Sequence, residues 1–144
     1  MAKDHDLFFV CSLIELISRT QKRKCSEVVQ ELGAECLRRV YRYADVLHCE
    51  PIAKIADELI EEAQILPGEY DNISRCRFLI PTYWDIGEVY ARLIQDVCGE
   101  KDKIQTLMEV YASWLSDDIQ NFNSDLYFQP RDYLRECWRE QRIL

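Results

Sequence analysis

Histidine, glycine and proline are scarce in this 144-residue sequence, which contains two, four and four of them. His5 lies near the N-terminus and His48 is the one interior histidine. The sequence therefore offers almost no histidines for a catalytic triad or a His-rich metal site. The glycines, at positions 33, 68, 87 and 99, are too far apart for a P-loop or a dinucleotide fingerprint. Low glycine and proline content, with 48% hydrophobic residues, also excludes a disordered chain.

The sequence has no long hydrophobic run. Near the N-terminus the apolar stretch Leu7–Cys11 follows the acidic Asp4 and Asp6, and the hydrophobic pattern is interrupted again at Glu15. A membrane-spanning helix needs about 20 apolar residues, and a signal peptide needs a basic flank before a longer apolar segment. We therefore expect a cytosolic protein without a membrane-spanning segment.

Cysteine is present, but not in pairs. The seven cysteines are spaced widely and irregularly, without the Cys-x-x-Cys spacing of redox motifs or the paired spacing of zinc sites. An odd number of thiols in a cytosolic chain favours reduced, structural cysteines. The sequence thus predicts no metal site and no cofactor.

Charge is unbalanced toward the acidic side, because 26 Asp and Glu against 18 Lys and Arg give a formal net charge of -8. Proteins that bind phosphate backbones cluster Lys and Arg, so direct binding of nucleic acid is not expected. The one basic island, Arg19–Lys24, falls where the first helix should end, and there it would complement the helix dipole.

Hydrophobic residues recur at helical spacing through most of the chain, and no segment alternates in a way that requires a sheet. The pattern predicts an all-α protein, a compact bundle of about six or seven helices. Gly33 and Gly99 supply stop signals, and Thr82 with Asp85 forms a capping-box start. Residues 73–80 are compatible with either helix or strand. The predicted helices span residues 7–17, 26–32, 34–44, 51–63, 83–98, 102–119 and 130–141.

A turn-rich joint occupies residues 65–72, where proline and glycine stand side by side. This joint is the best candidate for a boundary between an N-terminal helical half, residues 1–66, and a C-terminal helical half, residues 67–144. The alternative is that both halves form one single domain, which a chain of this length can also support.

One pair of residues, Arg42 and His48, has the spacing of a catalytic pair. Helical ribonucleases of the HEPN class use an Arg-x4-6-His pair, and the segment is similar to them in spacing. The resemblance implies a histidine for proton transfer at the 2′-hydroxyl and an arginine for the developing phosphate charge. The competing interpretation is that Arg42 is a solvated helix residue and that His48 caps or packs at a helix break.

Acidic pairs and one aromatic corner are the remaining candidates for contact with a partner. Adjacent carboxylates on a helix point about 100° apart, so they indicate a solvated face more than a Mg²⁺ site. An aromatic pair at a helix start is either a core plug or an interface anchor. The candidate partner-binding residues are Asp57, Glu58, Glu61 and Glu62 on the fourth predicted helix, and Tyr83, Trp84 and Asp85 at the corner.

The first half of the chain resembles a small family of uncharacterised bacterial proteins encoded beside predicted ADP-ribosyltransferase toxins. The residues that carry the resemblance are Leu7–Val10, Ile14 with Glu15, Ser26–Val29, Tyr43–His48 and Ile55–Ile60, whereas the chain from Asp71 onward extends beyond the family pattern. The resemblance implies an antitoxin-like or accessory binding protein whose partner is encoded nearby. It supplies no catalytic residue.

The leading hypothesis is therefore a non-enzymatic protein-binding module, a regulator that covers a partner protein through an acidic helical surface. One alternative is a HEPN-like ribonuclease using Arg42 and His48. Another is an acidic inhibitor of a nucleic-acid-binding enzyme, in the manner of anti-CRISPR or other anti-defence proteins, and a third is a small-ligand sensor with a pocket between helices. A homodimer is compatible with each of them.

Overall fold

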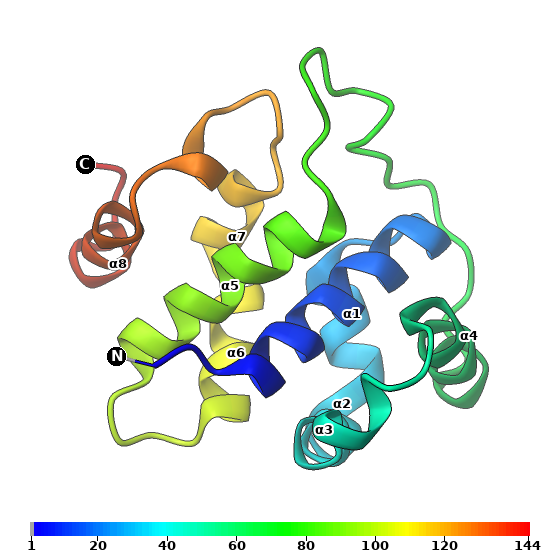
Figure 1. The fold of residues 1–144 in the computed structure, drawn as a ribbon. Helices are drawn as coiled ribbons and strands as arrows, with labels where there is room; N and C mark the ends of the chain where they lie inside the picture. The colour runs from blue at the N-terminus through cyan, green and yellow to red at the C-terminus, as the bar shows by residue number, and fades with distance from the viewer. Residues whose placement is uncertain (1) are drawn as a thin grey trace.

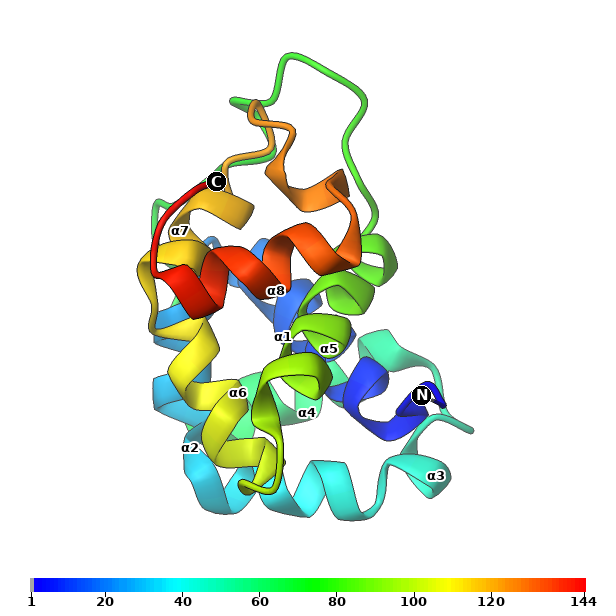
Figure 2. The same ribbon diagram turned by 90° about the vertical axis from the view of Figure 1, so that its left-hand side faces the viewer.

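A computed structural model describes residues 2–144 and confirms the all-α class (Figures 1 and 2). Within this range there are eight α-helices, one 3-10 helix and no strand. None of these helices is both long enough and apolar enough to cross a bilayer. The elements are α1 (His5–Gln21), α2 (Cys25–Arg42), α3 (Ala44–Leu47), α4 (Ile52–Ala63), α5 (Tyr83–Cys98), α6 (Lys103–Tyr111), α7 (Trp114–Ile119), the 3-10 helix η1 (Leu126–Phe128) and α8 (Arg131–Glu140).

Helix α1 is the centre of the fold and packs against α2, α3, α4 and α5. In Figure 1, α1 and α5 run alongside each other through the middle of the molecule. They come very close at Gly87, where an added Cβ atom would lie 2.7 Å from both the backbone nitrogen and the Cα atom of Ser12. Only a residue without a side chain allows the two helices to come so close.

The predicted stop at Gly33 is confirmed as a kink within α2, where this glycine has φ 81° and ψ 163°. The positive φ is readily adopted by glycine and rarely by other residues. The predicted helices over residues 26–32 and 34–44 are thus the two arms of α2. The second arm ends two residues earlier than predicted. The break expected at residues 45–50 is only partly confirmed, because the short helix α3 starts at Ala44 and continues to Leu47.

Helix α5 begins and ends where the sequence predicts. The Thr82 hydroxyl oxygen accepts a hydrogen bond from the Asp85 N–H at 3.0 Å, and the Asp85 carboxylate accepts one from the Thr82 N–H at 2.9 Å. At the other end Gly99, with φ 57°, terminates the helix. Asp85 is therefore committed to capping α5.

Two predictions about the second half are corrected. The single helix expected over residues 102–119 is wrong, because α6 ends at Tyr111 and α7 starts at Trp114. Ser113 causes the break: its backbone is extended, and its hydroxyl donates to the Val110 carbonyl at 2.6 Å and accepts from the Ser116 N–H at 3.4 Å. Residues 73–80 form neither helix nor strand: a turn ends at residue 75, and the rest of the segment is irregular.

The joint between the halves is held against the end of α1. The Gly68 N–H donates to the Gln21 carbonyl at 2.8 Å, the Tyr70 N–H donates to the Lys22 carbonyl at 2.9 Å, and the Gln21 side chain donates to the Ile65 carbonyl at 2.8 Å. The buried hydrophobic residues form one cluster with members from α1, α2, α4, α5, α6, α7 and α8. The same core therefore contains residues from both sides of the joint.

A charged side chain lies inside this core. Glu15 of α1 is completely buried. One carboxylate oxygen accepts hydrogen bonds from the Gln120 amide at 2.9 Å and the Cys25 thiol at 3.3 Å, while the other accepts one from Arg19 Nε at 2.9 Å. The Gln120 amide also donates to the Tyr90 hydroxyl at 3.1 Å. This polar network joins α1 to α2, to α5 and to the residue that follows α7.

Asp4 connects the start of α1 to two other helices. Its carboxylate accepts hydrogen bonds from the Leu7 N–H at 2.9 Å, the Tyr41 hydroxyl at 2.7 Å and the Lys103 ammonium at 2.6 Å. Burial raises the pKa of the Asp4 carboxyl, but the Lys103 ammonium and the two other donors outweigh burial and hold that pKa below its ordinary value.

We expect Asp4→Asn to lower the free energy of unfolding at neutral pH by about 1 kcal/mol, since asparagine still caps a helix but cannot pair with Lys103. A carboxyl whose pKa is depressed by folding stabilises the protein above its unfolded pKa of about 3.9, and this contribution disappears as the pH falls through the folded value. Urea unfolding at neutral pH and at about pH 3 should thus show a difference between wild type and variant that shrinks on acidification. Asp57→Asn, on exposed α4, is the control; an equal difference at both pH values would contradict the assignment.

Candidate functional site

Arg42 and His48 flank the short helix α3. Arg42 is the last residue of α2 and is exposed. His48 follows α3, its backbone N–H donates to the Ala44 carbonyl at 3.0 Å, and its side chain is exposed. His48 lines a groove, but Arg42 is not among the residues that form it.

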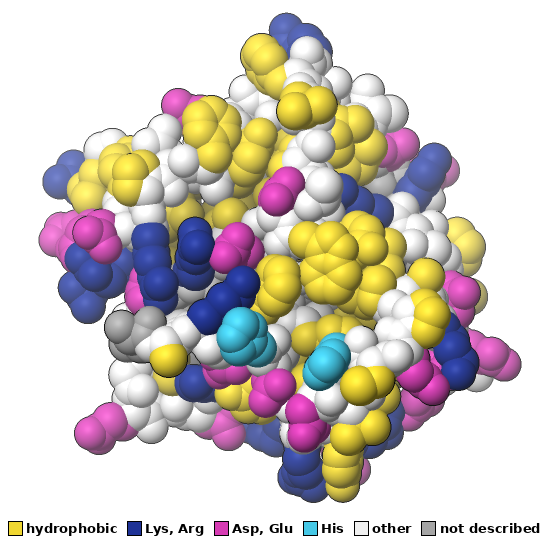
Figure 3. Space-filling view, in the orientation of Figure 1, with side chains coloured by type: hydrophobic (Ala, Val, Ile, Leu, Met, Phe, Trp, Pro, Cys, Tyr) yellow, Lys and Arg dark blue, Asp and Glu magenta, His cyan; other side chains and the backbone are white. Residues whose placement is uncertain are grey.

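This hollow, here called the Trp84 groove, lies between the N-terminal part of α1, the first turn of α5, and α3 with the residue that follows it. Its volume is about 590 Å³. It brings together His48 and Trp84, two candidates that are far apart in the sequence, and adds the second histidine. Figure 3 shows both histidines on one face, below a hydrophobic area. The groove is lined by His5, Asp6, Phe8, Phe9, Ala44, Asp45, His48 and Trp84.

The three residues of the aromatic corner have different surroundings. The Trp84 side chain is 39% exposed, and its ring centroid lies 5.5 Å from that of Phe8 and 5.1 Å from that of Tyr83. Tyr83 is half-buried, and Asp85 caps α5. Trp84 is therefore the member of the corner that lines the Trp84 groove, whereas Asp85 borders a separate hollow beside Ile80.

The acidic residues of α4 form a separate exposed surface. Asp57, Glu58, Glu61 and Glu62 are all exposed, and none of them lines the Trp84 groove. Glu62 pairs with Arg39 of α2 at 2.8 Å, so part of the negative charge is compensated within the chain.

A second apolar surface was not anticipated from the sequence. Its side chains are exposed to the extent of 66% at Phe78, 91% at Leu79 and 65% at Phe128, with Ile80 also exposed. The loop that carries residues 78–80 and the segment that carries Phe128 lie together at one end of the molecule in both ribbon views. These four residues are called the Phe128 surface below.

Phe128 lies at the meeting point of several hollows. With Tyr127 it lines one hollow beside Phe78 and Leu79, of about 280 Å³, and a second beside Ile80, of about 340 Å³. The two rings are in an edge-to-face arrangement with centroids 5.0 Å apart. The apolar surface is consequently hollowed rather than flat.

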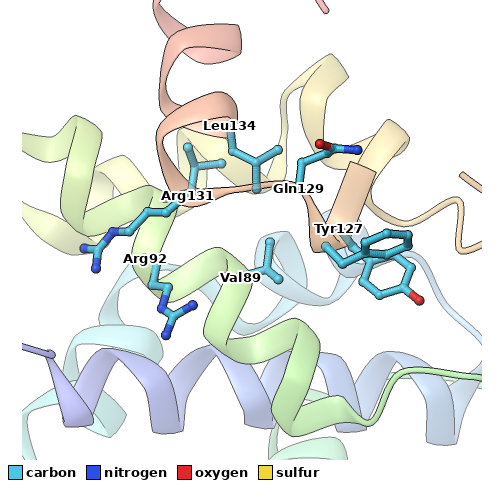
Figure 4. A pocket seen from close by; sticks show the side chains of 8 residues that line it. Val89, Arg92, Tyr127, Gln129, Arg131 and Leu134 are labelled. Atoms are coloured by element: carbon cyan, nitrogen blue, oxygen red, sulfur yellow. The ribbon is translucent and has the colours of Figure 1, made fainter. Parts of the chain in front are cut away.

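A third hollow, of about 260 Å³, lies between α5, η1 and α8 (Figure 4). Arg92 and Arg131 stand on one side of it and Tyr127 on the other. Arg131 makes two bonds of 2.7 Å to the Asp96 carboxylate, which raises the pKa of its guanidinium, and Arg92 pairs with Glu88 at 2.9 Å. Because both arginines already have carboxylate partners, this hollow is a poor site for an anion.

The cysteines are free thiols, and the interior ones are poorly suited to nucleophilic chemistry. Burial raises the pKa of the Cys11 thiol to about 12. Burial, and next the negative charge of Glu15, raise the pKa of the Cys25 thiol well above its ordinary value. A thiolate is the reactive form, so both side chains act as structural groups. Within residues 2–144, no three His, Cys, Asp or Glu side chains are placed to share a metal ion.

The sequence missed the Phe128 surface because Phe78, Leu79 and Ile80 form a short apolar run that is typical of a buried strand or helix. The available signal was Pro81, which directly follows the run and disfavours helical backbone at Ile80.

Comparisons with protein families, with curated proteins and with solved structures found no match to this chain.

Proposed function

We propose that this protein is a non-enzymatic protein-binding module that docks a partner protein on the Phe128 surface and acts as an antitoxin-like or inhibitory regulator. The observation that carries the proposal is the exposure of four large hydrophobic side chains, at positions 78, 79, 80 and 128, next to hollows. Contiguous exposed apolar surface of this kind typically marks a site of protein interaction.

The shape of the surface favours a protein partner. Leu79 projects almost completely into solvent, while Phe128 and Tyr127 border depressions that a partner's side chains can fill. In interfaces, a few large side chains in well-packed pockets supply most of the binding energy. Phe128 is the natural centre of such a group.

The net charge of -8 favours a basic partner. Exposed carboxylates on α4 would accelerate encounter with a positively charged protein, whereas the apolar surface would determine how long the complex lasts. The resemblance of the first half to proteins encoded beside predicted toxins suggests that such a partner is encoded nearby.

A double variant tests the proposal. We expect Leu79→Ser with Phe128→Ser to weaken partner binding by at least about a hundredfold, because hot-spot side chains each contribute about 2 kcal/mol or more. The measurement is affinity capture from the native host, followed by titration of the purified partner. Val46→Ser on α3 is the control, since Val46, at 63% exposed, is about as exposed as Phe128 but lies outside the Phe128 surface.

Other outcomes would redirect the assignment. Loss of binding on reversing the charges of Asp57, Glu58 and Glu61, with no effect of the double variant, would place the contact on α4 and favour an acidic inhibitor of a nucleic-acid-binding enzyme. RNA cleavage that disappears in His48→Ala would favour the HEPN-like ribonuclease. If the double variant binds the partner as well as the wild type, the Phe128 surface is not the docking site.

A further inference from the structure

We propose that the Trp84 groove binds a small organic cation, a substituted ammonium or guanidinium that carries an aromatic or alkyl body. The proposal is independent of the partner-binding function, because none of the residues of the Phe128 surface lines this groove.

The size and the walls of the groove suit a small organic molecule. Its volume of about 590 Å³ is within the range of roughly 300–1,000 Å³ that is usual for ligand pockets. Phe9 and Ala44 are buried and form an apolar floor, while Trp84 and the half-buried Phe8 provide aromatic walls. An aromatic or alkyl body that contacts these side chains would be partly removed from water.

The charge of the groove selects the sign of the ligand. Asp6 and Asp45 line it, and neither carboxylate takes part in an ion pair within residues 2–144. Lys3 is near, but its ammonium lies over the Phe8 ring, 4.1 Å from the centroid, and is paired with Glu88 at 3.3 Å. Two carboxylates without a partner beside aromatic rings make an environment that attracts a cation and repels an anion.

The nature of the cation follows from the placement of the polar groups. The two carboxylates and the two histidines line one groove, yet no three of them are placed to share a metal ion. A polyatomic cation can instead use the carboxylates for its charge and the exposed Trp84 ring for a cation–π contact, while its apolar body covers the floor.

Phenethylammonium is a suitable probe, and 2-phenylethanol is its neutral counterpart of similar size. We expect saturable binding of phenethylammonium, measured by calorimetry and by a change in tryptophan fluorescence, and binding of the alcohol that is at least about tenfold weaker. Asp45→Asn should weaken phenethylammonium binding by at least about tenfold, since it removes the negative charge that strengthens a hydrogen bond to the ammonium. Asp57→Asn, which removes one exposed carboxylate outside the groove, should leave the affinity unchanged.

A second variant tests the contribution of the Trp84 ring. Trp84→Leu should abolish the fluorescence response to phenethylammonium and lower its affinity in calorimetry, with the helical circular dichroism of the wild type retained. The proposal is overturned if phenethylammonium does not saturate the protein below about 10 mM. Equal binding of the alcohol, or equal loss of affinity in Asp45→Asn and Asp57→Asn, would overturn it as well.

Discussion

Gly87→Ala is expected to lower the free energy of unfolding by about 3 kcal/mol, the upper part of the usual range for overpacking a core. An alanine Cβ atom would lie 2.7 Å from the nitrogen and Cα atoms of Ser12, well inside van der Waals contact. These are backbone atoms in the middle of α1, so no side-chain rotation can relieve the clash. The two central helices would have to move apart, which would loosen the packing around them.

The sign of this effect makes it a strong test. Alanine is a better helix former than glycine by about 1 kcal/mol, so the same substitution in an uncrowded helix stabilises a protein. Urea unfolding followed by circular dichroism gives the difference directly. Gly99→Ala separates crowding from backbone strain: nothing lies within 4 Å of its Cβ position, but its positive φ disfavours alanine by about 1–2 kcal/mol, so this variant should lose less stability than Gly87→Ala. A more stable Gly87→Ala protein would mean that α1 and α5 are not so close.

Glu15→Leu is expected to lower the free energy of unfolding by about 3 kcal/mol. The substitution leaves the donors of Gln120 and Arg19 without their acceptor in the interior, and unpaired buried donors are costly. The Arg19 side chain keeps 17% of its surface exposed, so the loss is expected near the lower end for a broken buried ion pair. Equilibrium unfolding in urea measures the change.

Two further variants separate the network from simple loss of charge. Glu31→Gln removes a carboxylate that pairs with Arg23 at the surface, and it should change stability by less than about 1 kcal/mol. Glu15→Leu combined with Gln120→Leu removes acceptor and donor together, so the second substitution should recover part of the loss. If Glu15→Leu is as stable as the wild type, the buried network contributes nothing to stability.

Local signals explain which parts of the fold could be predicted. Thr82, Asp85 and Gly99 act on neighbouring backbone groups, so both ends of α5 follow from the sequence. The break at Ser113 was missed because hydrophobic spacing continued across it, from Tyr111 to Leu115, and periodicity does not register a single extended residue.

The burial of Glu15 and the composition of the groove could not be predicted in this way. Glu15 looks like a polar interruption of an apolar stretch, and one of its donors, Gln120, is 105 residues away. Trp84 and His48 were separate candidates, and only the packing of α3 and α5 against α1 brings them to one hollow. Such long-range pairs depend on tertiary structure rather than on local propensity.

The burial of the thiols determines the order in which the cysteines of this protein are oxidised. Cys49 is exposed, whereas Cys11 and Cys25 lie inside the core with their thiols held in the unreactive protonated form. Oxidants therefore modify folded molecules first at Cys49 and reach the interior sulfurs only in molecules that have already opened. Oxidation at Cys11 or Cys25 thus indicates that the molecule had unfolded earlier. Bulky adducts at these positions would prevent the oxidised molecules from folding again.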